Sequence, residues 1–396
     1  MKKKILFMVS SMNIGGVEKS LISLLNAIPK EKYEINILTL EKKGGFLNEI
    51  PSYINVHEAK WYREINHVIM DAPQKTVKIY LENGEYYKSI NFCIAYLYSK
   101  YFKNRNVLLK NIFKNTQCCE EIYDVAIAYA GPTEIIDYYI ANKVKANKKI
   151  SWVHFDISKH IINSKLYSKI YSKVNKIFTV SKEAKGQLEL AIPNIEDKTE
   201  IFYNVISKQM IREMSNQKEE FYGEFKGFKI VTVGRLSKEK GQDIAINVMH
   251  KLKEDGFNIR WYCIGEGRDR LYYENLISKL GLEKDFILLG SKLNPYTFIN
   301  QADLYVQPSR HEGYCLTLAE AKCLNKPIVT TDFTGAREQI KHNYNGLICK
   351  CNEEDLYEKI LLLYKDLNKR KEIVKNLSMD RIGKTNNVEK LFQFID

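Results

Sequence analysis

The stretch ILFMVSSMNIGGVEKSLISLLNAIP, residues 5–29, contains a complete strand–loop–helix unit. Its apolar run Ile5–Val9 is shorter than the roughly 7–15 residues of a signal-peptide core, and it predicts a buried first strand. A glycine-containing loop follows over residues 11–16. Apolar residues then recur at helical spacing up to Pro29: Val17, Leu21, Leu24, Leu25 and Ile28. A buried strand that leads through such a loop into a helix is typical of a parallel α/β fold.

The same alternation of short apolar runs and helical patterns continues along the chain and predicts two doubly wound parallel sheets. The first series of strands is expected at Ile5–Val9, Glu34–Leu40, Tyr123–Ala128, Lys149–Val153, Lys176–Val180 and Glu200–Tyr203. The second is expected at Lys229–Val233, Ile259–Ile264, Phe286–Gly290, Leu304–Val306, Ile328–Thr330 and Gly346–Ile348. In such sheets ligands bind beyond the carboxyl ends of the strands, so we expect a cleft between two domains.

Chain length agrees with two domains, because single cores rarely grow beyond about 250–300 residues and this chain has 396. We expect a first Rossmann-like domain over residues 1–205, and a polar connector over 206–227. A second Rossmann-like domain is expected over 228–380, and a final segment, 381–396, is expected to return to the first domain.

Charge and cysteine content restrict the location and the partners. The net charge is +13, and residues 1–205 contain 30 Lys and Arg against 21 Asp and Glu. This excess favours an anionic partner such as a membrane, or reflects a generally lysine-rich surface. Among the eight cysteines, the pairs Cys118-Cys119 and Cys349-Lys350-Cys351 lack CxxC spacing and lie among apolar residues, which indicates buried thiols in a reducing compartment and no structural metal site. No apolar run approaches about 18 residues, so a cytoplasmic protein without a membrane span is expected.

Residues 60–120 are rich in Tyr, Lys and Asn, and they contain an apolar stripe flanked by cations. The stripe consists of Leu108, Leu109, Ile112 and Phe113. It is compatible with a basic amphipathic helix on a membrane surface, or with a helix packed on the sheet. The basic residues are scattered and no nucleic-acid-binding module is recognisable, so nucleic acid is not an expected partner.

Two loops of the second domain carry the candidate chemistry. In GRLSKEKG, residues 234–241, Arg235 lies just beyond the end of a predicted strand and Lys240 just before a predicted helix. Two cations beside a helix amino terminus suit the binding of a diphosphate. The alternative is that Lys240 is one of several solvated lysines in a polar loop. In PSRHEGYCLTLAEA, residues 308–321, Glu312 lies in a loop and Glu320 in the following helix. Carboxylates bind sugar hydroxyls through charge-assisted hydrogen bonds, although two glutamates at this spacing could be coincidence. Gly313 would let backbone amides approach a ligand closely.

These residues resemble the family 4 retaining glycosyltransferases of the GT-B fold. Their E-x7-E motif corresponds to Glu312 and Glu320, and their G-R-x4-K segment to Gly234, Arg235 and Lys240. The resemblance covers nearly the whole chain and is most specific over residues 229–349.

The resemblance implies a role for each matched residue. Arg235 and Lys240 would bind the donor diphosphate, Glu320 the ribose, and Glu312 the transferred sugar. His154, which follows a predicted strand, would lie near the reacting sugar, although a lone histidine is more often structural. The remaining donor-binding candidates are Gly15, Gly16, Gly265, Gly313, Tyr314, Cys315 and Leu316. Many relatives have Phe-Gly in place of Tyr314-Cys315, and a cysteine there would narrow the sugar pocket.

The expected function is retaining transfer of a hexose or N-acetylhexosamine from a nucleotide-diphosphate sugar, with a UDP-sugar as the favoured donor. No DxD motif suits a metal ion at the cleft, so no metal or other cofactor is expected, and front-side attack by the acceptor hydroxyl is implied by the resemblance. The acceptor would be a lipid-linked or polymeric cell-surface glycan of the capsule, exopolysaccharide or teichoic acid type, reached at the inner face of an anionic membrane. The alternative is a nonenzymatic two-lobed protein that binds a sugar or a nucleotide.

Overall fold

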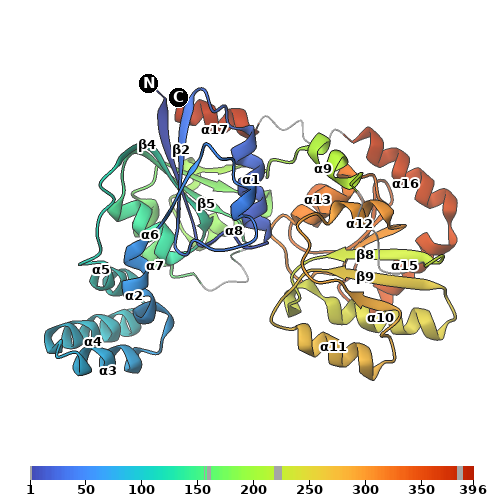
Figure 1. Cartoon of the computed structure of the whole chain (residues 1–396), viewed down its shortest axis with the longest axis horizontal. Helices are drawn as coiled ribbons and strands as arrows, with labels where there is room; N and C mark the ends of the chain where they lie inside the picture. Colours follow the sequence, from blue (N-terminus) through green and yellow to red (C-terminus); the bar gives the residue numbers. More distant parts are fainter. Residues whose placement is uncertain (1, 156, 158–161, 218–224, 381–386) are drawn as a thin grey trace. The chain divides into compact units, whose positions relative to one another are not determined.

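The computed structural model describes residues 2–155, 157, 162–217, 225–380 and 387–396 (Figure 1). Contacts divide the chain into two compact units. The first consists of residues 1–13, 24–203 and 388–396, and the second of residues 14–23 and 204–387. Each unit contains one parallel β-sheet, as the alternating pattern predicts.

The first unit is built on a seven-stranded sheet with the order β3-β2-β1-β4-β5-β6-β7. The strands are β1 (Lys3–Val9), β2 (Tyr33–Thr39), β3 (Asn55–Glu58), β4 (Ile122–Gly131), β5 (Lys145–Val153), β6 (Lys176–Thr179) and β7 (Thr199–Ile201). All neighbouring pairs are parallel. The order reverses between β1 and β4, so the sheet is doubly wound. The predictions located six of these strands and missed β3, which is only four residues long and half exposed.

The helices of the first part of the chain are α1 (Gly16–Ala27), α2 (Lys60–Met70), α3 (Pro73–Glu82), α4 (Tyr86–Tyr101), α5 (Arg105–Ile112), α6 (Glu134–Lys143), α7 (Ser164–Tyr171) and α8 (Lys182–Ala191). Four of them, α2 to α5, are inserted between β3 and β4, and α3 and α4 lie side by side (Figure 1). This four-helix insertion occupies the segment that the sequence marks as irregular.

The stripe at residues 108–113 packs inside the protein. Leu108, Leu109 and Phe113 are at most 7% exposed. The Phe113 ring meets Trp61 at 5.4 Å and Tyr138 at 5.0 Å between centroids. The interpretation of this stripe as a membrane-surface helix is therefore wrong. The alternative is right that the helix is packed, but its partners are α2, α6 and the rest of the insertion instead of the sheet.

The second unit contains a six-stranded parallel sheet with the order β10-β9-β8-β11-β12-β13. Its strands are β8 (Phe228–Val233), β9 (Ile259–Ile264), β10 (Phe286–Leu288), β11 (Leu304–Gln307), β12 (Ile328–Thr331) and β13 (Leu347–Cys349). Its helices are α9 (Lys208–Ser215), α10 (Gln242–Glu254), α11 (Arg270–Lys279), α12 (Tyr296–Gln301), α13 (Leu316–Cys323), α14 (Ala336–Gln339), α15 (Glu353–Lys365) and α16 (Leu367–Met379).

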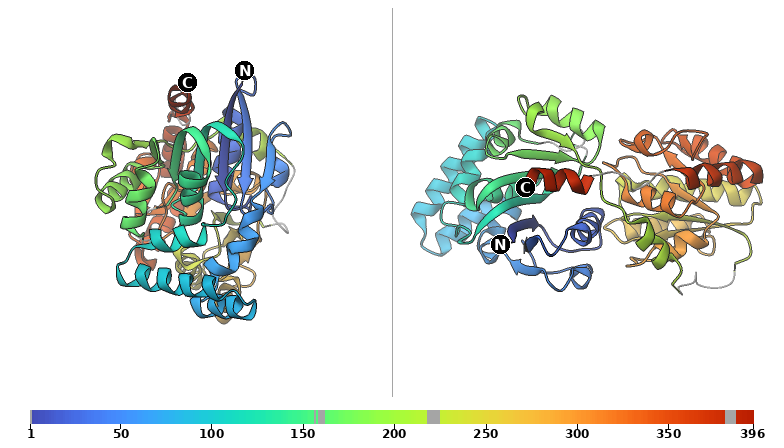
Figure 2. Two further views of the ribbon diagram at one scale, coloured as in Figure 1. Left: turned by 90° about the vertical axis from the view of Figure 1, so that its left-hand side faces the viewer. Right: turned by 90° about the horizontal axis from the view of Figure 1, so that it is seen from above.

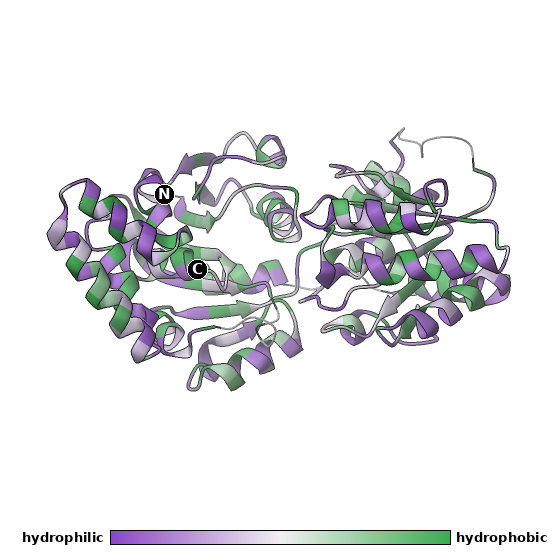
Figure 3. Ribbon diagram, turned by 90° about the horizontal axis from the view of Figure 1, so that it is seen from below, coloured by the Kyte–Doolittle hydropathy of each residue, from purple (hydrophilic) through white to green (hydrophobic). Residues whose placement is uncertain are grey.

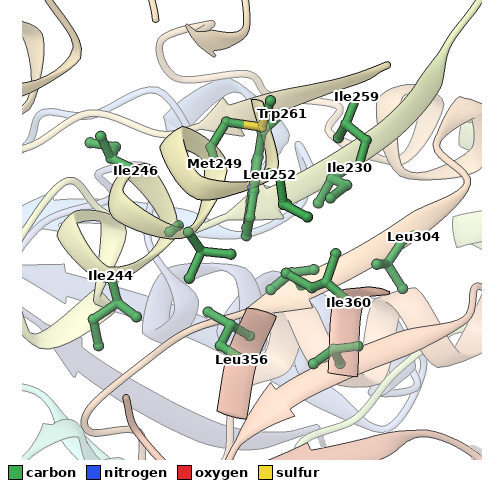
Figure 4. Close-up of a cluster of buried hydrophobic side chains, with 14 of the residues drawn as sticks. Ile230, Ile244, Ile246, Met249, Leu252, Ile259, Trp261, Leu304, Leu356 and Ile360 are labelled. Carbon is green, nitrogen blue, oxygen red and sulfur yellow. The ribbon is translucent and has the colours of Figure 1, made fainter. Parts of the chain in front are cut away.

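One core of this unit lies between the sheet and the helices α10 and α15. Trp261 and Ile230 of the sheet are fully buried against Met249 and Leu252 of α10 and Ile360 of α15 (Figure 4). The indole N–H of Trp261 donates to Thr232 Oγ1 at 3.0 Å, so this buried polar group is satisfied. A rigid sheet is thereby available to hold the loops at its carboxyl edge.

The expected connector, residues 206–227, is not wholly a linker. Residues 208–215 form α9, whose Ile211 is 1% exposed within the core of the second unit. The few apolar residues of segment 208–215 are spaced so that they lie on one side of a helix, which explains why α9 forms and packs on the core. The part of the connector at 218–224 and the start of the final segment, 381–386, lie outside the described residues.

The chain ends in helix α17 (Asn387–Ile395), whose residues from 388 onward belong to the first unit. Lys148 Nζ donates to the carbonyl oxygen of Phe394 at 2.6 Å, and Tyr33 and Phe392 stack at 5.3 Å between ring centroids. Both ends of the chain therefore lie on the same unit (Figure 2).

Helix length and cysteine exposure bear on two further expectations. Within the described ranges, no helix combines the length and the apolar content that a membrane crossing requires.

All eight cysteines are free. Cys118 and Cys351 are exposed, which corrects the expectation that both cysteine pairs are buried; apolar neighbours in sequence do not ensure burial in a loop.

Candidate functional site

The two candidate loops meet at the point where the second sheet reverses its strand order. The loop at residues 234–241 follows β8, and the loop at 308–315 follows β11. These strands are direct neighbours, with Leu304 opposite Ile230, and the chain winds outward from them in opposite directions. In an open parallel sheet this switch point is where ligands bind, because the loops on either side diverge and leave a crevice.

Lys240 and Glu312 form an ion pair across this point. Lys240 Nζ lies 2.7 Å from Glu312 Oε2, and the two side chains are only 21% and 11% exposed. Burial opposes the charge on Lys240, but the carboxylate of Glu312 outweighs it and raises the pKa of the lysine. Lys240 therefore stays charged, and it is not one more solvated lysine.

The carboxylate of Glu312 is also held from the strand beneath it. Ser309 Oγ donates to Glu312 Oε1 at 2.9 Å, and buried Gln307 donates from Nε2 to Ser309 Oγ at 2.8 Å. Tyr305 in turn donates its hydroxyl to Gln307 Oε1 at 2.5 Å. This chain of hydrogen bonds fixes Glu312 relative to β11, as a substrate-positioning carboxylate requires.

Two glycines permit the close approach of the loops. Gly241 has φ 71°, and a Cβ atom there would lie 2.0 Å from the carbonyl oxygen of Pro308. Gly265 has φ 145°, and its Cβ atom would lie 2.0 Å from the carbonyl oxygen of Gly234. Gly265 therefore holds the loop after β9 against the 234–241 loop, and its role in the structure is close backbone packing.

Glu320, in helix α13, is 3% exposed and is held by two groups that the sequence analysis did not identify. Its Oε1 atom accepts the hydroxyl hydrogen of Tyr296 at 3.1 Å and lies 2.8 Å from Lys19 Nζ. Lys19 belongs to the 14–23 segment of the second unit and also lies 4.3 Å from the centre of the Tyr296 ring. The Oε2 atom is buried without a hydrogen-bond partner among the described residues. An unpaired buried carboxylate oxygen is costly unless a ligand supplies a donor.

The segment from Gly313 to Leu316 turns sharply into α13. Cys315 has φ 59°, a left-handed conformation that is uncommon outside glycine, and burial raises the pKa of its thiol. Gln339 holds this turn by donating from Nε2 to the carbonyl oxygen of Tyr314. Leu316, the first residue of α13, lies beside Gly16, where an added Cβ atom would be 3.8 Å from Leu316 Cδ1.

Arg235 and Gly15 lie next to Glu18, which links the loop after β8 to the 14–23 segment. The Arg235 side chain is exposed, while its carbonyl oxygen accepts a hydrogen bond from Gln242 Nε2 at 2.8 Å. At Gly15 an added Cβ atom would lie 2.5 Å from Glu18 Oε2. Glu18 is largely buried, which raises its pKa, and the charge of Arg235 acts in the opposite direction.

His154 lies in the first unit, directly after β5, and is 8% exposed. Its ring is parallel to Trp152 and lies 4.6 Å from the ring of Tyr129. Burial lowers its pKa to about 3, so the imidazole is neutral at ordinary pH. Nε2 is buried and has no hydrogen-bond partner in the described part of the chain.

The second unit thus brings together Lys240, Glu312, Glu320 and the 313–316 turn, whereas His154 is placed on the other unit. Sequence reasoning missed Tyr296, Lys19 and Gln307. Each is an ordinary residue on a helix or strand with no recognisable motif, so only the contacts with the two glutamates identify them. Lys19 lies three residues after Gly16, and this closeness to the predicted glycine loop is the feature of the sequence that could have identified it.

Comparison with known proteins assigns the chain to a family. Residues 215–378 match the family model described as glycosyl transferases group 1. The uncharacterized glycosyltransferase MJ1178 of Methanocaldococcus jannaschii is 30% identical over 304 residues, which cover 74% of this chain and 80% of that protein. The chain therefore belongs to the group 1 glycosyl transferases and is a glycosyltransferase. A second protein of the same organism, MJ1059, is 30% identical over 219 residues, and the match spans only about half (54%) of its length.

A functionally named relative aligns over most of the chain. It is the Campylobacter jejuni α-1,4-N-acetyl-D-galactosaminyltransferase that acts on GalNAc-α-(1→4)-GalNAc-α-(1→3)-diNAcBac-PP-undecaprenol. The two proteins are 24% identical over 381 residues, which cover 94% of this chain and 92% of the relative.

Solved structures confirm the fold over the full length. Anabaena HepE in complex with UDP and glucose superposes with a TM-score of 0.71 at 17% identity, over 99% of both chains. A mutant of Staphylococcus aureus TarM, in complex with Fondaparinux, α-GlcNAc-glycerol and UDP, has a TM-score of 0.70 at 14% identity over 100% of both chains. Together with the two doubly wound parallel sheets, these likenesses confirm the GT-B fold that the sequence predicts.

Proposed function

We propose that the protein transfers a hexose or N-acetylhexosamine from a UDP-sugar to a lipid-linked or polymeric cell-surface glycan with retention of configuration. The observation that carries the proposal is the pair of carboxylates at the switch point of the second sheet. One, Glu312, is paired with a partly buried lysine; the other, Glu320, has a buried oxygen that lacks a donor among the described residues. A ribose or sugar hydroxyl would supply that donor.

The donor would be bound mainly by the second unit. Lys240 and Arg235 would bind the diphosphate, together with the backbone amides at the start of α13, since helix amino termini favour anions. Glu320 Oε2 would accept a ribose hydroxyl hydrogen, and Glu312 would accept from hydroxyls of the transferred sugar. Gly16, Gly313 and Cys315 would approach the donor through their backbone, and the Cys315 side chain would restrict the sugar that fits.

In the proposed reaction, the acceptor oxygen bonds to the anomeric carbon while the bond between that carbon and the diphosphate oxygen breaks. The acceptor proton passes to the departing diphosphate. Lys240 and Arg235 would stabilise the charge that develops on this leaving group, so that no metal ion would be needed. The neutral imidazole of His154 would donate or accept one hydrogen bond to the sugar, because a pKa of about 3 leaves it no charge to contribute.

The acceptor and the location are inferred from the relatives. The Campylobacter transferase acts on an undecaprenol-linked oligosaccharide. A further relative, 29% identical over 170 residues, is the Staphylococcus aureus capsular polysaccharide glycosyltransferase CapM. Together with the positive charge of residues 1–205, these names favour a protein that works in the cytoplasm, in peripheral contact with the inner face of an anionic membrane.

The proposal is tested with a panel of UDP- and GDP-sugars and a lipid-linked acceptor, in buffer with and without a metal chelator. We expect transfer from a UDP-sugar, an α-linked product from an α-linked donor by NMR, and unchanged rates with the chelator. Inverted product, or loss of rate that added metal restores, would contradict the corresponding part of the proposal. Binding of nucleotides without turnover on any acceptor would instead support the nonenzymatic alternative.

A further inference from the structure

Helix α4 of the four-helix insertion has an apolar face that is directed to solvent. Its members are Tyr87, Ile90, Ile94, Leu97, Tyr98 and Tyr101, which are between 44% and 82% exposed. They recur at intervals of one, three and four residues, so they form one continuous stripe that covers roughly a third of the helix circumference. We call this stripe the α4 apolar face. Figure 3 shows apolar positions along the helices of the insertion.

The folding of the insertion does not require the α4 apolar face. Helix α4 already has a buried side, on which Phe92 is 3% and Ala95 is 5% exposed, and these residues pack with Val68 of α2 and Leu108 of α5. Scattered exposed apolar residues are normal, but a contiguous stripe of large ones indicates a binding surface. The exposed side of α4 is therefore available for a partner outside the chain.

Charge and side-chain type identify the partner. Of the six Lys and Arg within residues 86–117, Lys88 and Arg105 pair with Glu85 and Glu134, whereas Lys100 and Lys103 are exposed next to the stripe. Half of the stripe is tyrosine, whose apolar ring and polar hydroxyl suit the boundary between headgroups and acyl chains. Two copies of this surface facing each other would bring like charges together, which disfavours a dimer through this face. An anionic bilayer satisfies both the cations and the apolar side chains.

We infer that the α4 apolar face docks on the surface of an anionic lipid bilayer, with α4 lying in the plane of the interface. The inference rests on the proposed function, which supplies a lipid-linked acceptor. The insertion begins directly after β3, at the carboxyl edge of the first sheet. The same edge of the sheet carries His154, which follows β5. Docking through the insertion would hold this edge of the first unit close to the headgroups, where the diphosphate of a lipid-linked acceptor lies.

The test is flotation of the full-length protein with vesicles of phosphatidylcholine containing phosphatidylglycerol, compared with vesicles of phosphatidylcholine alone. The wild-type protein should float with the anionic vesicles and less with the neutral ones. Replacement of two stripe residues, Ile94→Gln with Leu97→Gln, should lower the partition coefficient about tenfold or more, since both side chains lose their apolar burial in lipid. Replacement of the flanking cations, Lys100→Gln with Lys103→Gln, should lower binding about tenfold to the anionic vesicles only.

A matched control removes two equally exposed apolar side chains elsewhere, Leu190→Gln with Leu271→Gln, which are 82% and 69% exposed. This control should float like the wild type. The inference is overturned if the wild type does not float with anionic vesicles, or if the Ile94→Gln, Leu97→Gln variant floats as well as the wild type. It is also overturned if that variant turns a dimer into a monomer while its flotation is unchanged, because the face would then bind a second copy.

Transfer to a short, water-soluble acceptor separates this inference from the proposed function. The stripe variant should transfer sugar to that acceptor at the wild-type rate, because α4 is not part of the donor site. A wild-type protein that floats but transfers no sugar to any acceptor would refute the proposed function and leave the docking surface established. A protein that transfers sugar but does not float would refute the docking surface alone.

Discussion

Replacement of Lys240 by alanine tests the site most directly, because the lysine pairs with Glu312 and would contact the donor diphosphate. The ion pair is 2.7 Å long and largely shielded from water. Breaking a fully buried pair costs about 3–5 kcal/mol, but here Glu312 keeps its hydrogen bond from Ser309 and some exposure, so we expect a loss of about 1–2 kcal/mol in the free energy of unfolding. The variant should therefore fold.

The effect on catalysis should be larger than the effect on stability. Removal of one preorganised group that stabilises developing charge typically lowers kcat by about 10²–10³, or about 3–4 kcal/mol. The alanine variant also leaves the Glu312 carboxylate uncompensated next to the diphosphate, so the KM for the donor should rise. Steady-state kinetics with the best donor of the panel measure both constants, and urea unfolding measures stability.

A double-mutant cycle with Glu312→Gln separates the interaction between Lys240 and Glu312 from the effects of the two single substitutions. Neutralising Glu312 should partly restore the donor KM of Lys240→Ala, with a coupling energy of about 1 kcal/mol or more. Lys238→Ala is the matched control, since Lys238 is an exposed lysine of the same loop. If Lys240→Ala folds and keeps kcat/KM within about threefold of the wild type, like Lys238→Ala, the assignment of the diphosphate site is refuted.

Three further changes test the loops, a buried acid and the second carboxylate. Gly241→Ala should lower the free energy of unfolding by about 3 kcal/mol or more in urea unfolding, because a left-handed alanine is strained and its Cβ atom would collide with a backbone carbonyl. Burial raises the pKa of Asp137 to about 6, above its value in the unfolded chain. The folded state therefore binds this proton more tightly, and the resulting stabilisation is complete below about pH 4 and is lost as the pH rises through 6. Relative to Asp137→Asn, the wild type should lose about 3 kcal/mol between about pH 4 and about pH 7. Tyr296→Phe, which removes the hydrogen bond to Glu320, should raise the donor KM about tenfold and change kcat little, measured by steady-state kinetics.

Each of these changes has its own control. Gly256 has φ 79° and no atom within 4 Å of an added Cβ, so Gly256→Ala should cost only the backbone strain of about 1–2 kcal/mol; equal losses for both glycines would contradict the predicted collision. For the buried acid, the control is the pH dependence of the free energy of unfolding of Asp137→Asn. If it runs parallel to that of the wild type, Asp137 does not cause the loss of stability between about pH 4 and about pH 7. For the tyrosine, the exposed Tyr344→Phe should behave as wild type, and a Tyr296→Phe variant with unchanged KM would remove Tyr296 from the donor site.

Much of the fold and part of the site follow from local sequence patterns. Buried parallel strands are short apolar runs, so twelve of the thirteen strands in the described ranges were located, and the missed β3 is short and half exposed. Glu312 and Lys240 were predicted as site residues because their motifs lie in loops that follow β11 and β8, and ligands of a parallel sheet bind beyond the carboxyl ends of the strands. Tyr296 and Gln307 were not identified, since their role depends on which side chain they meet across the fold.

The sequence by itself determined the two parallel sheets, the family and the motif residues of the candidate site, because strand burial, helix periodicity and loop position are properties of neighbouring residues. Only the tertiary structure decided which apolar stripe is free. The stripe at residues 108–113 and the α4 apolar face are both apolar and flanked by lysines, yet α2 and α6 cover the first and no described element covers the second. Burial depends on what packs against a helix, and that partner is distant in sequence.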